Sequence, residues 1–351
     1  MIIEKSKIYK ILVRVPNWIG DVVMSMPALE GLRSNFPSAR LTVVAKPWVI
    51  DLLDANPSVD EIVAYDTKSG PLAGPRSILA MAKRIREANY DMAVLFQNAF
   101  EAALLVWLGK VRHRVGYSTD GRAILLTHAI PRPKTGYRSR HQVDYYINLL
   151  RSIGLKIASR DPRLFLSEEL KDRARQFMSR HEFDPDRITV GLAPGAMYGE
   201  AKRWPAARFA QVADLAVDRW NANILIFGSE KEKHIGEAVQ KAMRHPSIDL
   251  SGKTSLGQAI ELVSICSFFV TNDSGLMHIS AALGVPTLAI FGSTDPTATG
   301  PRGPKTRIIY HEVDCAPCLR PTCSKDFRCM LSIEPDEVWR ELKKLRAEVA
   351  R

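Results

Sequence analysis

Short runs rich in β-branched residues alternate with segments of helical spacing along this chain. Residues 10–15, 40–45, 61–65 and 91–96 are typical of strands. Helical spacing falls between or just after them, at 21–36, 48–55 and 76–88. Because parallel strands are joined by crossovers that are usually helices, the alternation predicts an α/β fold whose parallel sheet is covered on both faces.

The same alternation restarts in the second half of the chain. It predicts two Rossmann-like domains, at 1–165 and 187–334, with a linker region at 166–186, and the 351 residues are enough for two domains. Residues 335–351 predict a terminal amphipathic helix, which we expect to pack back on the first domain. The expected elements of the second half are strands at 188–194, 223–228, 247–250, 268–273 and 287–292, and helices at 205–220, 232–244, 255–266 and 275–284.

Basic residues outnumber acidic ones, with 49 Lys and Arg against 38 Asp and Glu. The resulting formal charge of +11 favours an acidic partner, which could be nucleic acid, an anionic membrane surface or a phosphorylated small molecule. No apolar run reaches the roughly 18 residues of a membrane span, and the first 20 residues are too mixed for a signal peptide. We therefore expect a cytoplasmic protein.

Several common reaction classes lack their usual motifs here. The chain has no G-x-G-x-x-G, no G-x-x-x-x-G-K-[ST] and no H-E-x-x-H, which speaks against nicotinamide redox chemistry, P-loop hydrolysis and zincin proteolysis. In doubly wound sheets, ligands bind beyond the carboxyl ends of the strands. The loops that follow the expected strands are therefore the places to look for a site.

Two of these loops carry charged residues after a glycine. In 16–23, Asp21 follows Gly20 at the start of a helix, where it is either a helix cap or a general base. In 193–205, Lys202 and Arg203 are either a solvated pair or a phosphate clamp supported by the backbone of the glycine-bearing loop.

Two further loops could complete a binding site. Residues 271–284 begin with a capping cluster, and a helix N-terminus there would present unpaired N–H groups to an anion. Its candidates are Asn272, Asp273, Ser274, Gly275 and His278, the histidine being either a ligand contact or an ordinary core residue. In 227–233, an acidic residue after the strand could bind ribose hydroxyls or simply begin a helix, and Glu230 and Glu232 are the candidates.

Four segments, in order, resemble glycosyltransferase family nine, the ADP-heptose:lipopolysaccharide heptosyltransferases. They are PNWIGDVVMS, QNAFEAALLVWLG with RVGY, PGAMYGEAKRWP and TNDSGLMHISAALGVP, and the resemblance covers nearly the whole chain. The resemblance implies a GT-B fold, with two Rossmann-like domains facing across a cleft. The first domain would bind the acceptor and the second the nucleotide-sugar.

Carried over by motif position, the resemblance implies a set of roles. Asp21 would be the catalytic base and Lys202 the cation that faces the donor diphosphate, with Glu232 near the ribose. Asn272, Asp273, Ser274, Gly275 and His278 would surround the phosphates.

The implied reaction is inverting transfer of heptose from ADP-L-glycero-D-manno-heptose to the lipopolysaccharide inner core, most closely the addition of the second heptose. No cofactor or metal is required for it. Transfer to another core acceptor, as the first or third heptose, or from another nucleotide-sugar, stays open.

Residues 110–151 hold nine Lys or Arg and are the expected acceptor-binding part, with Arg112, Arg114 and Arg122 as candidates. Basic residues there would attract the phosphates and carboxylates of a lipid A-Kdo-heptose precursor at the cytoplasmic face of the inner membrane, and a solvated charged face is the alternative. We expect a monomer in peripheral contact with that membrane. A nucleic-acid-binding protein is suggested by the pI alone, and no nucleic acid is expected as a partner.

Five cysteines complete the candidates. Cys266 lies in an apolar run and is expected to be buried. The other four could supply the thiolates of a structural zinc or iron–sulfur site, although their spacing is irregular for either, or could be free thiols; they are Cys315, Cys318, Cys323 and Cys329.

Overall fold

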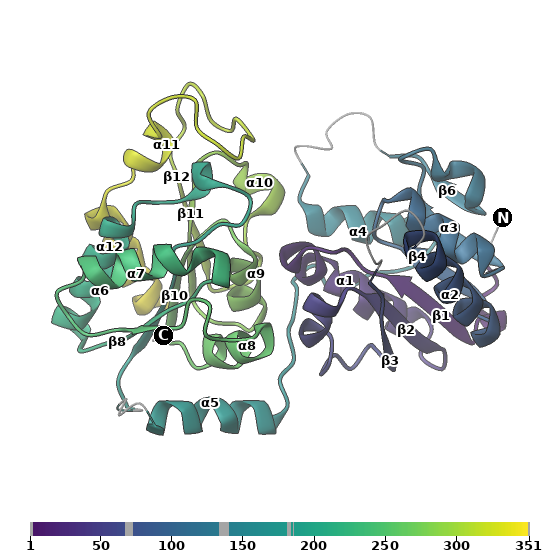
Figure 1. Cartoon of the computed structure of the whole chain (residues 1–351), viewed down its shortest axis with the longest axis horizontal. Coiled ribbons are helices and arrows are strands. Elements are labelled where there is room, and N and C mark those ends of the chain that lie inside the picture. The colour runs from purple at the N-terminus through teal and green to yellow at the C-terminus, as the bar shows by residue number, and fades with distance from the viewer. Residues whose placement is uncertain (1–2, 67–72, 133–139, 181–183, 185, 350–351) are drawn as a thin grey trace. The chain divides into compact units, whose positions relative to one another are not determined.

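The computed structural model describes the chain except for residues 1–2, 67–72, 133–139, 181–183, 185 and 350–351. It divides into two compact units, Met1–Pro162 and Arg163–Arg351 (Figure 1). The boundary falls close to the end of the first expected domain, and each unit is built around its own parallel sheet.

The first unit contains a six-stranded parallel sheet in the order β3-β2-β1-β4-β5-β6. Its central strands are almost entirely buried, as expected for a sheet covered on both faces. The strands are β1 (Lys10–Arg14), β2 (Arg40–Ala45), β3 (Glu61–Ala64), β4 (Met92–Leu95), β5 (His113–Tyr117) and β6 (His128–Ile130).

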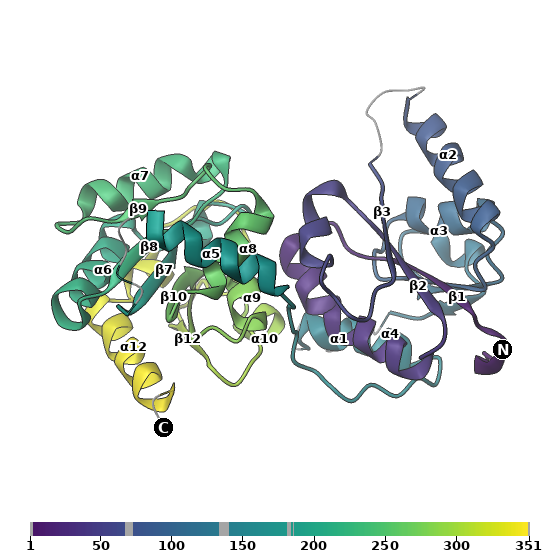
Figure 2. The ribbon, with the colours of Figure 1, turned by 90° about the horizontal axis from the view of Figure 1, so that it is seen from below.

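Helices cover both faces of this sheet. α1 packs beside α4 and α2 beside α3, and the two pairs lie on opposite faces (Figure 2). The expected helix at 48–55 is instead the short 3-10 helix η2, which ends at Leu52. The α-helices are α1 (Ile19–Asn35), α2 (Ala73–Ala88), α3 (Phe100–Leu108) and α4 (Gln142–Arg151); the 3-10 helices are η1 (Lys5–Lys7), η2 (Pro47–Leu52) and η3 (Arg122–Leu125).

The second unit contains a second six-stranded parallel sheet, in the order β12-β11-β10-β7-β8-β9. Strands β7, β10 and β11 are buried along their whole length. The strands are β7 (Thr189–Ala193), β8 (Asn223–Ile226), β9 (Ile248–Asp249), β10 (Phe268–Asn272), β11 (Thr287–Phe291) and β12 (Thr306–Tyr310).

The helices of the second unit also form two layers. α6, α7 and α12 cover one face of the sheet, and α8 and α9 cover the other (Figures 1 and 2). The α-helices are α5 (Glu168–Arg180), α6 (Ala206–Trp220), α7 (Lys233–Ala242), α8 (Leu256–Ser264), α9 (Gly275–Ala282), α10 (Pro296–Thr299), α11 (Arg328–Leu331) and α12 (Pro335–Val349); the 3-10 helices are η4 (Glu200–Lys202) and η5 (Glu230–Glu232).

The terminal helix and the helix of the expected linker both pack on elements of the second unit. The terminal helix α12 packs against α6 and β12 of the second unit, because Val338, Leu342 and Leu345 insert into that unit's core. The expected linker at 166–186 contains α5, which packs on α8 and is tied to it by an ion pair between Arg173 and Glu261 at 3.4 Å.

Candidate active site

Asp21 lies in the first turn of α1, directly beyond the carboxyl end of β1. Its side chain is half-buried, and its Oδ1 accepts a hydrogen bond from the Tyr146 hydroxyl at 3.2 Å. Tyr146 comes from α4, which packs along α1. The loop after the first strand and a helix more than a hundred residues later thus meet at one carboxylate.

Tyr146 is held as a hydrogen-bond donor by its surroundings. The pKa of its hydroxyl is raised well above the usual range, first by burial and then by the charge of Asp21. Gln142 Nε2 donates to the same hydroxyl at 3.2 Å. Sequence reasoning did not identify Tyr146, because a tyrosine in a helix of apolar spacing reads as an ordinary core residue.

The loop after β4 lies at the same edge of the sheet and carries Asn98, part of the QNAF segment. The Asn98 side chain exchanges hydrogen bonds with the Tyr145 hydroxyl, at 2.7 and 3.0 Å. Tyr145 stacks on Tyr117 with ring centroids 4.2 Å apart. Asn98 is therefore a fixed, half-exposed amide at the carboxyl end of β4.

Arg122 is a structural residue. It has no exposed surface, and its guanidinium donates to the carbonyls of Tyr117, at 2.9 Å, and Gln97, and to Asn98 Oδ1 at 3.0 Å. Burial lowers its pKa to about 10, so it stays charged at neutral pH. Its role in this structure is to hold the loop after β4.

The structure places the predicted acceptor-binding residues Arg112, Arg114 and Arg122 in different surroundings. Arg112 precedes β5 and Arg114 is its second residue, so both start from the amino ends of the strands, whereas Asp21 lies at the carboxyl ends. Arg114 donates to the carbonyls of Leu125 and Val111, each at 2.6 Å. The sequence of a basic stretch does not show which of its arginines will hydrogen-bond within the protein and which will face solvent.

Replacing Arg122 by alanine is expected to lower the free energy of unfolding by about 2–4 kcal/mol, because its buried hydrogen-bond acceptors lose a donor. Arg112→Ala is the matched control; since this arginine is exposed, its effect should stay within about 0.5 kcal/mol. Urea unfolding followed by tryptophan fluorescence measures both. Equal effects of the two substitutions would contradict the structural role of Arg122.

In the second unit, Lys202 and Asp273 form a buried ion pair. Lys202 Nζ lies 2.5 Å from Asp273 Oδ2, and the same oxygen accepts from Thr294 Oγ1 at 2.7 Å. The side chains of the pair are only 13% and 6% exposed. The ammonium also lies 4.7 Å from the centre of the Tyr198 ring. These contacts fix the lysine in one place at the carboxyl ends of β7 and β10.

Asn272 ties the loop after β7 to the end of β10. Its Oδ1 accepts from the Trp204 backbone at 3.1 Å, and its Nδ2 donates to the Pro194 carbonyl at 2.7 Å. Ser274 caps α9 by accepting from the Met277 backbone. Asn272 is thus a brace, and the N-terminus of α9 opens beside the ion pair.

The remaining predicted residues of this unit have clear positions. Gly275 is the first residue of α9, and His278 is buried one turn later. Glu232 Oε2 accepts from the Ser229 hydroxyl at 2.6 Å and from the Ser229 backbone at 2.9 Å. The second bond is half of a capping box, in which the Ser229 side chain accepts from the Glu232 backbone. A Cβ added at Gly195 would lie 2.4 Å from Glu232 Oε1. The second carboxylate oxygen therefore lies against the glycine of the loop that carries Lys202.

The segment 314–327, which contains three of the cysteines, supports the same loop. The Tyr198 hydroxyl donates to the Leu319 carbonyl at 2.7 Å, and the Ala201 backbone donates to the Pro321 carbonyl at 3.0 Å. A Cβ added at Gly199 would lie 2.1 Å from the Pro321 oxygen, so only glycine fits this approach. The segment thus helps to fix the residues around Lys202.

The metal alternative for the cysteines is not supported. Within the described residues, no three His, Cys, Asp or Glu side chains are placed to hold a metal ion, and all five cysteines are free thiols. Cys329 is buried in the core, which raises its pKa, whereas Cys318 is exposed. Cys266 is buried as expected, and burial raises its pKa.

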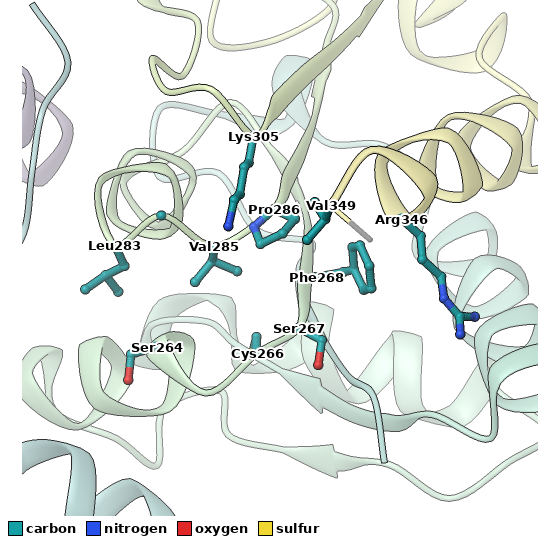
Figure 3. Close-up of a pocket in the computed structure, with 11 residues that line it drawn as sticks. Ser264, Cys266, Ser267, Phe268, Leu283, Val285, Pro286, Lys305, Arg346 and Val349 are labelled. Atoms are coloured by element: carbon teal, nitrogen blue, oxygen red, sulfur yellow. The ribbon is translucent and has the colours of Figure 1, made fainter. Parts of the chain in front are cut away.

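A surface pocket of about 400 Å³ lies at the opposite edge of the second sheet (Figure 3). Phe268, Pro286 and Lys305 line it from the amino ends of β10, β11 and β12, and Arg346 joins them from α12. It is therefore separate from the ion pair of Lys202 and Asp273.

Comparison with known proteins shows the family to which the chain belongs. The model of glycosyltransferase family 9 (heptosyltransferase) matches residues 78–327, more than half of the chain. The chain belongs to this glycosyltransferase family. The match includes Lys202, Glu232 and Asp273, while Asp21 precedes it.

The similarity to known family members extends over nearly the whole length of this chain. The chain is 32% identical over 353 residues to lipopolysaccharide heptosyltransferase 2 of Salmonella typhimurium, covering 97% of this chain and 99% of that protein. The solved structure of E. coli ADP-heptose lps heptosyltransferase II is 29% identical, with a TM-score of 0.83, 97% of this chain and 100% of that chain covered. A family 9 glycosyltransferase from Veillonella parvula gives 25% identity and a TM-score of 0.86, with 97% of each chain covered. The GT-B fold and the glycosyltransferase class expected from the sequence are confirmed.

Proposed function

We propose that this chain transfers heptose from ADP-L-glycero-D-manno-heptose to the heptose of a lipopolysaccharide inner-core precursor, lipid A-Kdo-heptose, adding the second heptose. The similarity to heptosyltransferases 2 over nearly the full length supports the donor and acceptor classes. The observation that carries the chemistry is the Lys202–Asp273 pair at the carboxyl ends of β7 and β10, where the strand order reverses. That is where a doubly wound sheet binds a nucleotide.

Asp21 is the proposed base. Its half-buried carboxylate takes the proton from the attacking acceptor hydroxyl as that oxygen bonds to the anomeric carbon. Tyr146, donating to Oδ1, keeps the carboxylate in one orientation. Because a single attack occurs opposite the leaving group and no covalent enzyme intermediate forms, the configuration at the anomeric carbon inverts.

Lys202 and the N-terminus of α9 are proposed to stabilise the leaving ADP. When the bond from the anomeric carbon to the diphosphate oxygen breaks, its electron pair adds negative charge to the diphosphate, and a fixed cation and helix N–H groups offset it. This requires no divalent metal. Asp273 has the same sign of charge as the diphosphate, so its proposed role is to hold Lys202 rather than to bind phosphate.

Glu232 is the proposed ribose contact. Oε2 is occupied by the capping box, which leaves Oε1, beside Gly195, to accept from ribose hydroxyls. The phosphate side of the proposed site is completed at the end of β10 and the start of α9. Asn272 braces the loop after β7, Ser274 caps α9, and Gly275 and His278 lie in the first turns of this helix.

Replacing Gly199 by alanine is expected to weaken ADP binding and lower turnover, each by about tenfold, because the new Cβ must displace the Lys202 loop or the Pro321 backbone. Isothermal titration with ADP and a turnover assay measure the two effects. Gly284→Ala is the control; it imposes strain at a φ of +76° but has no atom within 4 Å of the new Cβ. A Gly199→Ala enzyme with normal ADP affinity would disprove the coupling.

The proposed setting is the cytoplasmic face of the inner membrane, where a monomer makes peripheral contact with its lipid-linked acceptor. Among the described residues, no helix is long and apolar enough to span a bilayer. The net charge of +11 would favour an anionic surface.

The test is direct. The purified chain is incubated with ADP-heptose and a set of inner-core acceptors carrying no heptose, one heptose or two, and products are identified by mass spectrometry. We expect transfer to the one-heptose acceptor, inverted configuration in the product and full activity in a brief assay with excess EDTA. Preference for another acceptor would change the assignment within the family, and no transfer from ADP-heptose to any acceptor would overturn it.

A further inference from the structure

Two exposed tryptophans lie at the carboxyl edge of the first sheet. Trp18 and Trp48 are 67% and 53% exposed. Trp18 immediately precedes α1, in whose first turn Asp21 lies, and Trp48 follows β2. Because β1 and β2 are adjacent parallel strands, with Arg14 opposite Val44, the segments that follow them leave the same edge of the sheet.

The Trp48 side chain is held in place through the loop that precedes Asp21. Its indole N–H donates to the Asn17 carbonyl at 2.9 Å. Asn17 Oδ1 in turn accepts from the buried guanidinium of Arg14 at 2.9 Å, which also donates to the carbonyls of Val15 and Val44. The Lys46 ammonium lies 5.6 Å from the centre of the Trp48 ring. Since the polar group of Trp48 is satisfied within the protein, what the side chain offers to solvent is the rest of its apolar ring surface.

Charge speaks against an anionic bilayer as the partner of this surface. Residues 15–21 and 46–52 contain one basic residue, Lys46, and two acidic ones, Asp21 and Asp51. Lys46 is itself paired with Asp66 at 2.9 Å. Surfaces that bind anionic lipid carry clusters of Lys and Arg. Exposed indoles beside an acidic group instead suit a neutral, amphipathic ligand.

We propose that Trp18 and Trp48 form a stacking platform for a sugar ring of the acceptor. A sugar ring has an apolar C–H face and a polar hydroxyl edge, so an indole can cover the face while the edge reaches polar side chains. This inference rests on the proposed function, because a base at Asp21 requires an acceptor hydroxyl within hydrogen-bond reach. The platform would thereby be a determinant of acceptor affinity that the donor does not contact.

The test uses a deacylated, water-soluble one-heptose acceptor, so that lipid contacts do not contribute. Trp18→Ala and Trp48→Ala are each expected to raise the acceptor KM by about tenfold, the scale of single aromatic stacking contacts. The donor KM and the ADP dissociation constant should stay unchanged. Trp18→Phe and Trp48→Phe keep an aromatic ring and should recover most of the affinity, although Trp48→Phe loses the hydrogen bond to Asn17.

The matched control is Trp107→Ala, which removes another exposed tryptophan side chain from the end of α3 in the same unit. It should leave the acceptor KM unchanged. If the wild-type chain is active and Trp18→Ala and Trp48→Ala have normal acceptor KM values, the platform is disproved while the proposed function stands. If their KM values are normal but their sedimentation with vesicles of phosphatidylglycerol and phosphatidylethanolamine is lost, the surface is a membrane contact. Absence of transfer by the wild-type chain overturns both proposals.

Discussion

Replacing Asp21 by asparagine is expected to reduce the turnover of heptosyl transfer by about 100-fold or more, the usual scale for loss of a general base. Asparagine has almost the same shape and can still accept from Tyr146, so the first turn of α1 should be retained. The amide oxygen is a far weaker base than a carboxylate and cannot take the proton of the acceptor hydroxyl. ADP affinity should not change, because the nucleotide contacts are proposed in the second unit. Steady-state kinetics and ADP titration measure the two quantities.

Tyr146→Phe is the companion variant. It keeps the buried ring and removes one hydrogen bond to Asp21, worth about 1 kcal/mol, so turnover should fall by no more than about tenfold. Loss of the positioning hydroxyl should therefore reduce turnover much less than loss of the base itself. Near-normal turnover of Asp21→Asn would remove this carboxylate from the mechanism, whatever Tyr146→Phe does.

The strands that sequence analysis found and those it missed differ in a physical way. Runs such as 40–45 and 188–194 are continuous and β-branched, which is typical of strands buried on both faces, and they match β2 and β7 closely. The strand β5 contains His113, Arg114 and Gly116, so its pattern is not apolar. This strand forms because β4 and β6 pair with it on either side, and a local sequence pattern cannot show such pairing.

The residues of the candidate site likewise include some that sequence analysis found and some that it missed. Asp21, Lys202 and Asp273 could be found because each lies at or beyond the end of an expected strand, where parallel sheets bind ligands. Tyr146 and Tyr198 could not be found in this way. Tyr146 acts by donating to Asp21, which is far from it in the sequence, and Tyr198 acts through its ring, which lies near the Lys202 ammonium. Arg122 shows the converse: its charge is visible in the sequence, while the backbone carbonyls that accept its hydrogen bonds are visible only in the fold.

Replacing Lys202 by alanine is expected to weaken ADP binding by about 10- to 100-fold and to lower turnover by about 100-fold or more. The cation would meet the diphosphate in both the bound substrate and the transition state, so affinity and turnover should fall together. Part of the loss has a second cause. Without Lys202, the 6% exposed carboxylate of Asp273 loses its 2.5 Å ion pair and would repel the diphosphate.

The double variant Lys202→Ala/Asp273→Asn separates the two causes. Asparagine keeps an acceptor for Thr294 and removes the uncompensated charge, so ADP affinity should recover in part. Turnover should stay low, because the Lys202 cation that would offset the charge developing on the leaving diphosphate is absent. Recovery of turnover along with affinity would mean that Lys202 serves only to neutralise Asp273, and the stabilisation of the leaving group would then have to come from other groups, such as the N-terminus of α9.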